Sequence, residues 1–121
     1  MLFEKMTAGK YTGLYVDNDL GLSFLEKGTA EYRNAAYLSA GALDAAYLAL
    51  RLTLAEYLYK EPPVFVFDDA FVRLDDERFE SVCGILAALA EKYQVIVLSC
   101  QTREAQRLAA LGARVSEIES R

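Results

Sequence analysis

Histidine is absent from the sequence, and cysteine and proline occur only twice each. Without histidine, general-base catalysis by an imidazole and metal sites built on imidazole ligands are both excluded. The two cysteines, Cys83 and Cys100, stand in an apolar helical pattern and at an expected strand end, without the short spacings of a metal or disulfide motif. We expect both to be core residues of a protein from a reducing compartment.

Long apolar runs and an excess of basic residues are missing as well. The most apolar stretch, residues 37–59, is interrupted by Asp44, Arg51 and Glu56, so it does not read as a membrane span. The N-terminus has no basic region followed by a cleavage site, which favours a cytoplasmic protein without a signal peptide. The net charge of −5 argues against a broad surface for nucleic acid or anionic membranes, although a local basic site stays possible.

The 121 residues suffice for one hydrophobic core, so we expect a single domain over residues 1–121. Near the N-terminus, Tyr11–Val16 and Leu20–Leu25 are β-prone runs separated by turn residues, which predicts a β-hairpin followed by a loop over residues 30–38. Val64–Phe67 and Val95–Leu98 are continuous apolar runs, as expected of strands buried on both faces. A helical pattern between them predicts a right-handed βαβ unit and an α/β fold with parallel strands and flanking helices.

Three helices are expected around these strands. The first begins near Gly41, has its apolar stripe at Leu43, Tyr47, Leu50, Leu54 and Tyr57 or Leu58, and stops at Glu61-Pro62-Pro63. Leu48 and Leu52 stand on a further face, so we expect this helix to be buried on more than one side. Asp75 is the expected N-cap of the second, with an apolar stripe at Phe79, Val82, Cys83, Leu86, Leu89, Ala90 and Tyr93. The third is capped by Thr102 and ends at Gly112, and residues 113–118 are expected to form a last strand.

Polar side chains follow both buried strands. Asp68 and Asp69 end the first strand, and Ser99, Cys100 and Gln101 end the second. Ligands of open α/β sheets bind at the C-terminal ends of the parallel strands, so we expect these groups on one rim. Adjacent carboxylates can hold Mg²⁺ and can orient or deprotonate a water molecule. The alternative is that one aspartate merely caps the next turn.

A second candidate lies where the first helix begins, at Ser39-Ala40-Gly41. Serine and glycine both suit an N-cap, which gives a purely structural reason for their presence. A helix N-terminus also presents free N–H groups and a positive dipole end, so an anion could dock there. The residues alone leave both interpretations open.

Taken in order, these segments resemble the heads of ABC-type ATPases with long coiled coils. That branch includes the structural-maintenance-of-chromosomes (SMC) proteins, the zinc-hook double-strand-break repair ATPase, RecF, RecN and the YhaN-like ATPases. "YLSAGALDAAYLALRLTL" resembles their signature motif, "VFVFDDAF" their Walker B strand, "VRLDDERF" their D-loop and "VIVLSCQTRE" their switch region. The hairpin resembles the segment before the signature in YhaN-like proteins.

The resemblance implies a role for each candidate residue. Ser39 and Gly41 would contact the γ-phosphate of an ATP held by the opposite protomer, and Asp75 would line the dimer seam. Asp68 would support Mg²⁺ through a water, and Asp69 would polarise the attacking water. Gln101 would face the γ-phosphate. These roles imply the fold of the C-terminal half of a P-loop NTPase, with ATP and Mg²⁺ as cofactors.

The sequence departs from the family pattern at several points. Asp69 replaces the usual glutamate, although the RecF-like branch also uses aspartate, and Gln101 replaces a histidine. Ala42 stands where glutamine or glutamate is frequent. The motif G-x-x-x-x-G-K-[ST] is absent, and the nearest lookalike, at Gly9-Lys10, lacks its first glycine and its final Ser or Thr.

The resemblance therefore implies the C-terminal lobe of a head whose Walker A lobe belongs to the same or another chain. It further implies a homodimer through the signature and D-loop face, with DNA contacted by the complete protein and no membrane involved. One alternative is a non-catalytic interaction module that retains the fold. Another is a different Mg²⁺ enzyme, similar to Toprim phosphotransfer domains, using Asp68, Asp69 and Asp75.

Overall fold

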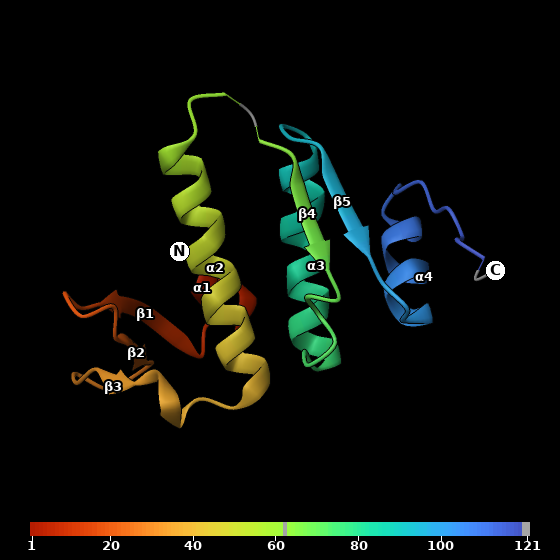
Figure 1. Ribbon diagram of the computed structural model, residues 1–121. Coiled ribbons are helices and arrows are strands. Elements are labelled where there is room, and N and C mark those ends of the chain that lie inside the picture. Colours follow the sequence, from red (N-terminus) through yellow and green to blue (C-terminus); the bar gives the residue numbers. More distant parts are fainter. Residues whose placement is uncertain (62, 120–121) are drawn as a thin grey trace.

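The computed structural model describes residues 1–61 and 63–119, and Figure 1 shows its arrangement. An antiparallel sheet has the order β1-β2-β3, and a separate parallel pair joins β4 to β5. The α/β class with an N-terminal hairpin is thereby confirmed. The elements are α1 (Leu2–Met6), β1 (Tyr11–Val16), β2 (Leu22–Glu26), β3 (Arg33–Asn34), the 3₁₀ helix η1 (Ala35–Tyr37), α2 (Ala40–Leu58), β4 (Phe65–Asp68), α3 (Asp76–Ala90), β5 (Val95–Leu98) and α4 (Thr102–Ala110).

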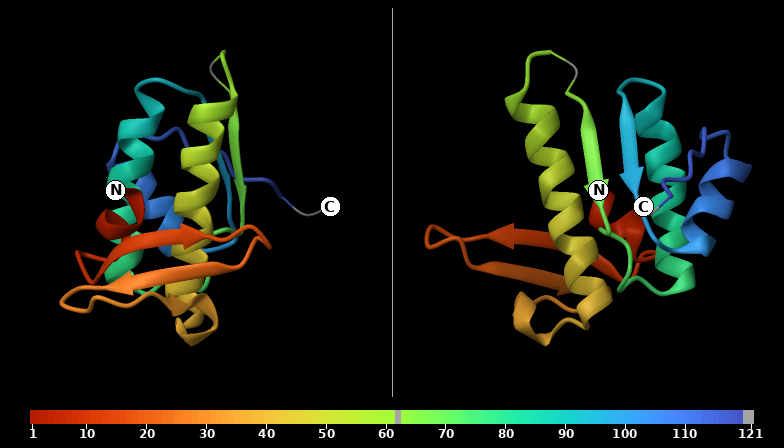
Figure 2. Two further views of the ribbon diagram at one scale, coloured as in Figure 1. Left: turned by 90° about the vertical axis from the view of Figure 1, so that its left-hand side faces the viewer. Right: turned by 45° about the vertical axis from the view of Figure 1, so that its right-hand side comes forward.

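The hairpin forms where the sequence predicts it, but its turn is longer. Asp17 accepts hydrogen bonds from the backbone N–H groups of Asp19 (2.9 Å) and Gly21 (2.7 Å), which holds the turn together. Leu20 has a positive φ of 63° and is exposed, so β2 begins at Leu22. Residues 30–38, expected as a loop, contain β3 and η1. In both views of Figure 2 this sheet lies across the N-terminal half of α2.

Helix α2 packs mainly through small side chains. Leu43 of the predicted stripe packs against the core, and the further face with Leu48 and Leu52 is confirmed as buried, but the rest of the stripe is wrong. Its buried residues are Gly41, Ala42, Ala45, Ala46, Leu48, Ala49 and Leu52. Tyr47, Leu54, Tyr57 and Leu58 are exposed, Tyr57 at 86%. Alanine and glycine let the helix approach its neighbours closely, and of its larger side chains Leu48 and Leu52 are buried. The helix ends at Leu58, while Pro62, part of the predicted stop, lies outside the described residues.

Only one face of the β4–β5 pair is covered. Helix α3 lies behind this pair in Figure 1, with Phe67 buried in the shared core. On the opposite face Val66 is 50% exposed, Leu98 43% and Ile96 38%. The parallel pairing that the sequence predicts is confirmed. The expectation that both strands are buried on both faces is wrong for this chain.

Helix α3 agrees closely with the prediction, whereas the part of the chain after residue 100 does not. The buried side of α3 consists of Phe79, Val82, Cys83, Leu86 and Leu89, although the predicted Ala90 is exposed. Gln101, rather than Thr102, is the N-cap residue of α4, and Gly112 follows that helix with a φ of 99°. Residues 113–118 form no strand, because no strand of the described chain pairs with them. In Figure 1 they run past α4.

Among the described residues, none of the helices has the length and apolar character that crossing a membrane requires.

Candidate functional site

The acidic pair stands at the C-terminal end of β4. Asp68 is the last residue of that strand and pairs with Leu98 of β5. Asp69 leaves the strand with a positive φ of 46°, and its backbone N–H donates to the carbonyl oxygen of Leu98 at 2.9 Å. Both aspartates are exposed. Their carboxylates are therefore available to a ligand at this edge of the sheet.

Residues 99–101, here called the switch segment, follow β5 beside the acidic pair. The Cys100 thiol donates to Asp69 Oδ1 over 3.8 Å, a weak contact that brings the two strand ends together. The backbone N–H of Gln101 donates to Ser99 Oγ at 2.9 Å. The predicted shared rim is thus present for Asp68, Asp69 and Gln101, which follow two paired strands.

The two cysteines occupy different environments. Cys83 is fully buried in α3, and that burial raises the pKa of its thiol to about 11. Cys100 is exposed, so the expectation of two core thiols is correct for Cys83 and wrong for Cys100. The strand-end position of Cys100 explains the difference, because residues after the strand lie on the rim.

A buried carboxylate that the sequence did not single out holds the switch segment. Glu104 in α4 is completely buried, and its Oε2 accepts a hydrogen bond from Ser99 Oγ. Its Oε1 has no hydrogen-bond partner within the described residues. Glutamate in the first turn of a polar helix normally indicates a solvated side chain near the dipole, so the sequence carries no signal for this contact.

Ser39 and Gly41 serve the start of α2. Ser39 is the N-cap residue, and its Oγ accepts from the backbone N–H of Ala42 at 3.3 Å. A Cβ atom on Gly41 would lie 2.7 Å from the carbonyl oxygen of Arg73. Glycine is therefore required here by a close backbone approach. Within the described residues no hydrogen bond connects Ser39 or Gly41 with Asp68, Asp69 or Gln101.

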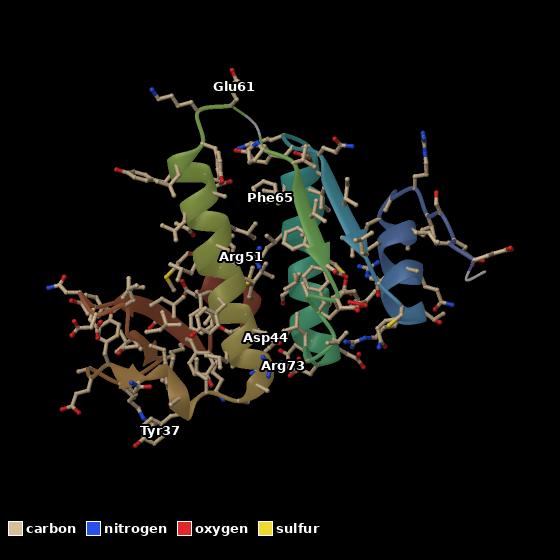
Figure 3. The ribbon with its side chains drawn as sticks, viewed as in Figure 1. Tyr37, Asp44, Arg51, Glu61, Phe65 and Arg73 are labelled. Atoms are coloured by element: carbon tan, nitrogen blue, oxygen red, sulfur yellow. The ribbon has the colours of Figure 1, made fainter. Side chains whose placement is uncertain are left out.

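Residues 70–75, here called the D-loop segment because they overlap the stretch 72–79 that resembles a D-loop, lie between β4 and α3 and contact α2. Arg73 makes a two-pronged ion pair with Asp44 of α2, with Nε 2.7 Å from Oδ2. Figure 3 shows these two side chains beside each other at the start of α2. Asp75 accepts from the backbone N–H of Arg78 at 2.8 Å, which confirms it as the N-cap of α3. The start of α2, the D-loop segment and the start of α3 thus meet at one end of the molecule.

A groove with a volume of about 410 Å³ runs between α2 and β4 and reaches the acidic pair. It carries charges of both signs, because Arg51 and Arg73 share its lining with Asp44, Asp68 and Asp69.

The donor set at the strand ends suits only a partial metal site. Within the described residues no three aspartate, glutamate or cysteine side chains converge to hold a metal ion. Mg²⁺ commonly takes one or two carboxylates together with waters and phosphate oxygens, so the adjacent Asp68 and Asp69 fit a site completed by a nucleotide. Asp75 caps α3 and pairs with Arg78, so the structure does not support a three-aspartate metal enzyme.

Comparison with solved structures identifies the fold. A chain from a study of the ATP-driven dimerization and DNA-stimulated activation of SMC ATPases matches with a TM-score of 0.75 and 18% identity, over 99% of this chain and 75% of that one. An Smc head domain from Pyrococcus furiosus, with an extended coiled coil and bound to the C-terminal domain of ScpA, matches with a TM-score of 0.68 and 19% identity. An SmcHead bound to the C-winged helix domain of ScpA matches with a TM-score of 0.69 and 18% identity.

The alignment with the Pyrococcus furiosus chain covers 91% of the present chain but only 28% of that chain. The alignment with the SmcHead bound to the C-winged helix domain covers 88% of the present chain and 34% of that one. No family model matches the sequence, and no curated protein matches it. The similarity in structure therefore establishes the class: the chain has the fold of part of an SMC-like ABC ATPase head, which is an α/β fold of the P-loop NTPase type.

Proposed function

We propose that this chain is the C-terminal half of an ABC-type ATP-hydrolysing head from a cytoplasmic DNA-repair or chromosome-maintenance ATPase. The observation that carries the proposal is the meeting of Asp68, Asp69 and the switch segment at the ends of two parallel strands, in the fold of an SMC head. Ligands of such sheets bind at this edge. A Walker A lobe from elsewhere in the same or another chain completes the site.

In this proposal, the residues of the chain position the reacting groups. Asp69 orients the attacking water with its exposed carboxylate, and Asp68 holds a water of the metal shell. These residues would hold Mg²⁺ together with ATP, and the ion would supply charge neutralisation at the phosphates during phosphoryl transfer. Gln101 can donate a hydrogen bond to the γ-phosphate but cannot carry charge. We therefore expect slower turnover than a positively charged residue at this position would allow.

The proposed partners are a Walker A lobe and a second head. The uncovered face of the β4–β5 pair, with Val66, Ile96 and Leu98 exposed, favours an additional layer of structure over the sheet. Ser39 is exposed at the start of α2, so it would face the second head in a homodimer, while the buried Gly41 lies against the Arg73 carbonyl oxygen of the D-loop segment. DNA is proposed to contact the complete protein, since this chain carries a net charge of −5.

The test is Asp69→Asn in the complete head, measured by ATP turnover and by ATP binding. Removing the carboxylate should abolish turnover and leave ATP binding intact, because the water loses its polarising group while the phosphate contacts remain. Asp19→Asn, in the exposed hairpin turn, is the matched control and should change neither. Loss of ATP binding in Asp69→Asn, or normal turnover, contradicts the assigned role.

A non-catalytic interaction module is the second candidate. It is favoured by the absence of a Walker A motif from this sequence and by Gln101 at the switch position. Calorimetric titration of Mg-ATP separates the two functions. An ATPase half-site gives no heat with this chain alone and clear binding once a Walker A lobe is supplied, whereas an interaction module gives no heat in either case.

A further inference from the structure

Arg103, in the first turn of α4, reaches across to the D-loop segment. Its Nη2 donates to the backbone carbonyl oxygens of Leu74 at 2.8 Å and Phe71 at 3.4 Å. Its Nη1 pairs with Asp76 Oδ1 at 2.6 Å. The guanidinium lies 5.0 Å from the centroid of the Phe79 ring, a distance that suits a cation–π contact. One side chain thus holds two carbonyl groups of the D-loop segment from a different helix.

The switch segment is fixed to the same turn of α4. The backbone N–H of Glu104 donates to the carbonyl oxygen of Gln101 at 3.1 Å. Ser99 Oγ donates to the buried Glu104 carboxylate and accepts from the backbone N–H of Gln101. Any movement of the first turn of α4 therefore displaces Gln101.

The D-loop segment is in turn fixed to the start of α2. The Arg73 carbonyl oxygen lies against Gly41, and the Arg73 guanidinium pairs with Asp44. The contacts run continuously from α2 through Arg73 and the Leu74 carbonyl to Arg103, and from there to Gln101.

We propose that Arg103 is a positioning residue that couples the D-loop segment to the switch segment. The inference rests on the proposed function, because it assigns a consequence to the movement of Gln101. When a second head presses on the D-loop segment, Arg103 transmits the displacement to α4 and sets the position of the Gln101 amide. A planar guanidinium suits this task, since its Nη1 holds Asp76 at the start of α3 while its Nη2 holds the carbonyl oxygens of Phe71 and Leu74.

Arg107 provides a matched control one turn further along α4. Its guanidinium pairs with Glu80 of α3 through two nitrogens, with Nε 2.7 Å from Oε2. It therefore joins the same two helices as Arg103 but makes no hydrogen bond to the D-loop segment. A merely structural role of the α3–α4 ion pairs predicts equal effects of replacing either arginine, and coupling predicts unequal effects.

The first experiment uses the full 121-residue chain and needs no nucleotide. Arg73→Ala releases the D-loop segment from Asp44, and the backbone amide shift of Gln101 is recorded by ¹⁵N–¹H correlation spectra. We expect Arg73→Ala to move the Gln101 signal in the otherwise unchanged chain and in Arg107→Ala, but not in Arg103→Ala. A signal that moves equally in Arg103→Ala, or that does not move in the unchanged chain, overturns the coupling.

A test of folding and a substitute variant guard against a variant that does not fold. Cys83 is buried and Cys100 exposed, so alkylation of Cys83 reports loss of the fold in any variant. If Arg103→Ala unfolds, Arg103→Lys replaces it, because lysine retains the charge but has one nitrogen in place of the two, Nη1 and Nη2, that hold Asp76 and the carbonyl groups of the D-loop segment at the same time. The effect of Arg73→Ala on the Gln101 amide signal is then compared in the Arg103→Lys background, with the same outcomes for and against the coupling.

The second experiment uses the complete head. We expect Arg103→Ala to lower kcat by about tenfold with little change in KM, because a misplaced group in the transition state reduces turnover without weakening substrate binding. Arg107→Ala should leave both values unchanged. Equal losses in the two variants overturn the positioning role. An inactive complete head contradicts the proposed function, while the amide shifts still test the coupling separately.

Discussion

Replacing Gly41 by alanine tests the contact between α2 and the D-loop segment. The new Cβ would meet the Arg73 carbonyl oxygen at 2.7 Å, so the backbone must shift. Overpacking of this kind costs about 1–3 kcal/mol. Alanine recovers up to about 1 kcal/mol of helix propensity over glycine. We therefore expect Gly41→Ala to lower the free energy of unfolding by about 1 kcal/mol.

Gly84 is the matched control, because it is also helical but exposed in α3. Apart from the neighbouring backbone of its own helix, no atom of the described residues lies within 4 Å of a Cβ built on Gly84, so alanine adds propensity without a clash. Gly84→Ala should raise the free energy of unfolding by up to about 1 kcal/mol.

Urea and thermal unfolding of the isolated chain measure both effects, with a melting-temperature shift of about 4 °C per kcal/mol expected. The two variants should move in opposite directions. Stabilisation by Gly41→Ala similar to that of Gly84→Ala would refute the close approach. The only remaining reason for glycine at position 41 would then be room for a bound phosphate.

Three further predictions concern ionisation and burial. The hydrogen bonds from Arg107 lower the pKa of Glu80 below 4.5, so the stability difference between the native chain and Glu80→Gln should be constant above about pH 5 and disappear as the pH falls through the lowered folded-state pKa. Burial raises the Cys83 pKa from 9.0 to about 11, so stability should fall as the pH rises from 9 to 11, and Cys83→Ala should flatten this part of the pH profile. Ser99→Ala should cost about 1–3 kcal/mol by leaving the Glu104 carboxylate without its partner. The double variant with Glu104→Met should regain most of that loss in urea unfolding, and no recovery would contradict the assigned contact.

Much of the site follows from local chemistry that a sequence displays. A buried strand followed by Asp68 and Asp69, and a second followed by Gln101, predicts a common rim, and the parallel pairing confirms it. Ser39 and Asp75 have the side chains that N-caps require, and both cap their helices. The caps depend on neighbours within a few residues, and the rim follows from the order strand, helix, strand, so the sequence is enough to reveal both.

Contacts between distant segments were not predictable in this way. Helix α2 is apolar around most of its circumference, so periodicity gave no means of choosing between its alanine face and its leucine and tyrosine face. The wrong choice followed from weighting large side chains over small ones. Arg103 and Glu104 look like ordinary charged residues of a polar helix. Their roles arise from carbonyl groups some thirty residues away and from a serine in the preceding turn.

The same difficulty affects the end of the chain. Residues 113–118 have the composition of a strand, yet a strand needs a neighbour to receive its hydrogen bonds. The sequence displays the apolar pattern but not the availability of that neighbour.

The left-handed backbone of Asp69 limits which amino acids can occupy this position. With a φ of 46°, aspartate, asparagine and glycine are tolerated at low cost, whereas a longer or branched side chain adds strain. Aspartate in place of the glutamate usual in ABC-type heads is therefore the carboxylate best suited to this bend. A glutamate here would add the strain of a longer side chain in a left-handed conformation, so exchanging one acid for the other at this bend is not neutral for the fold.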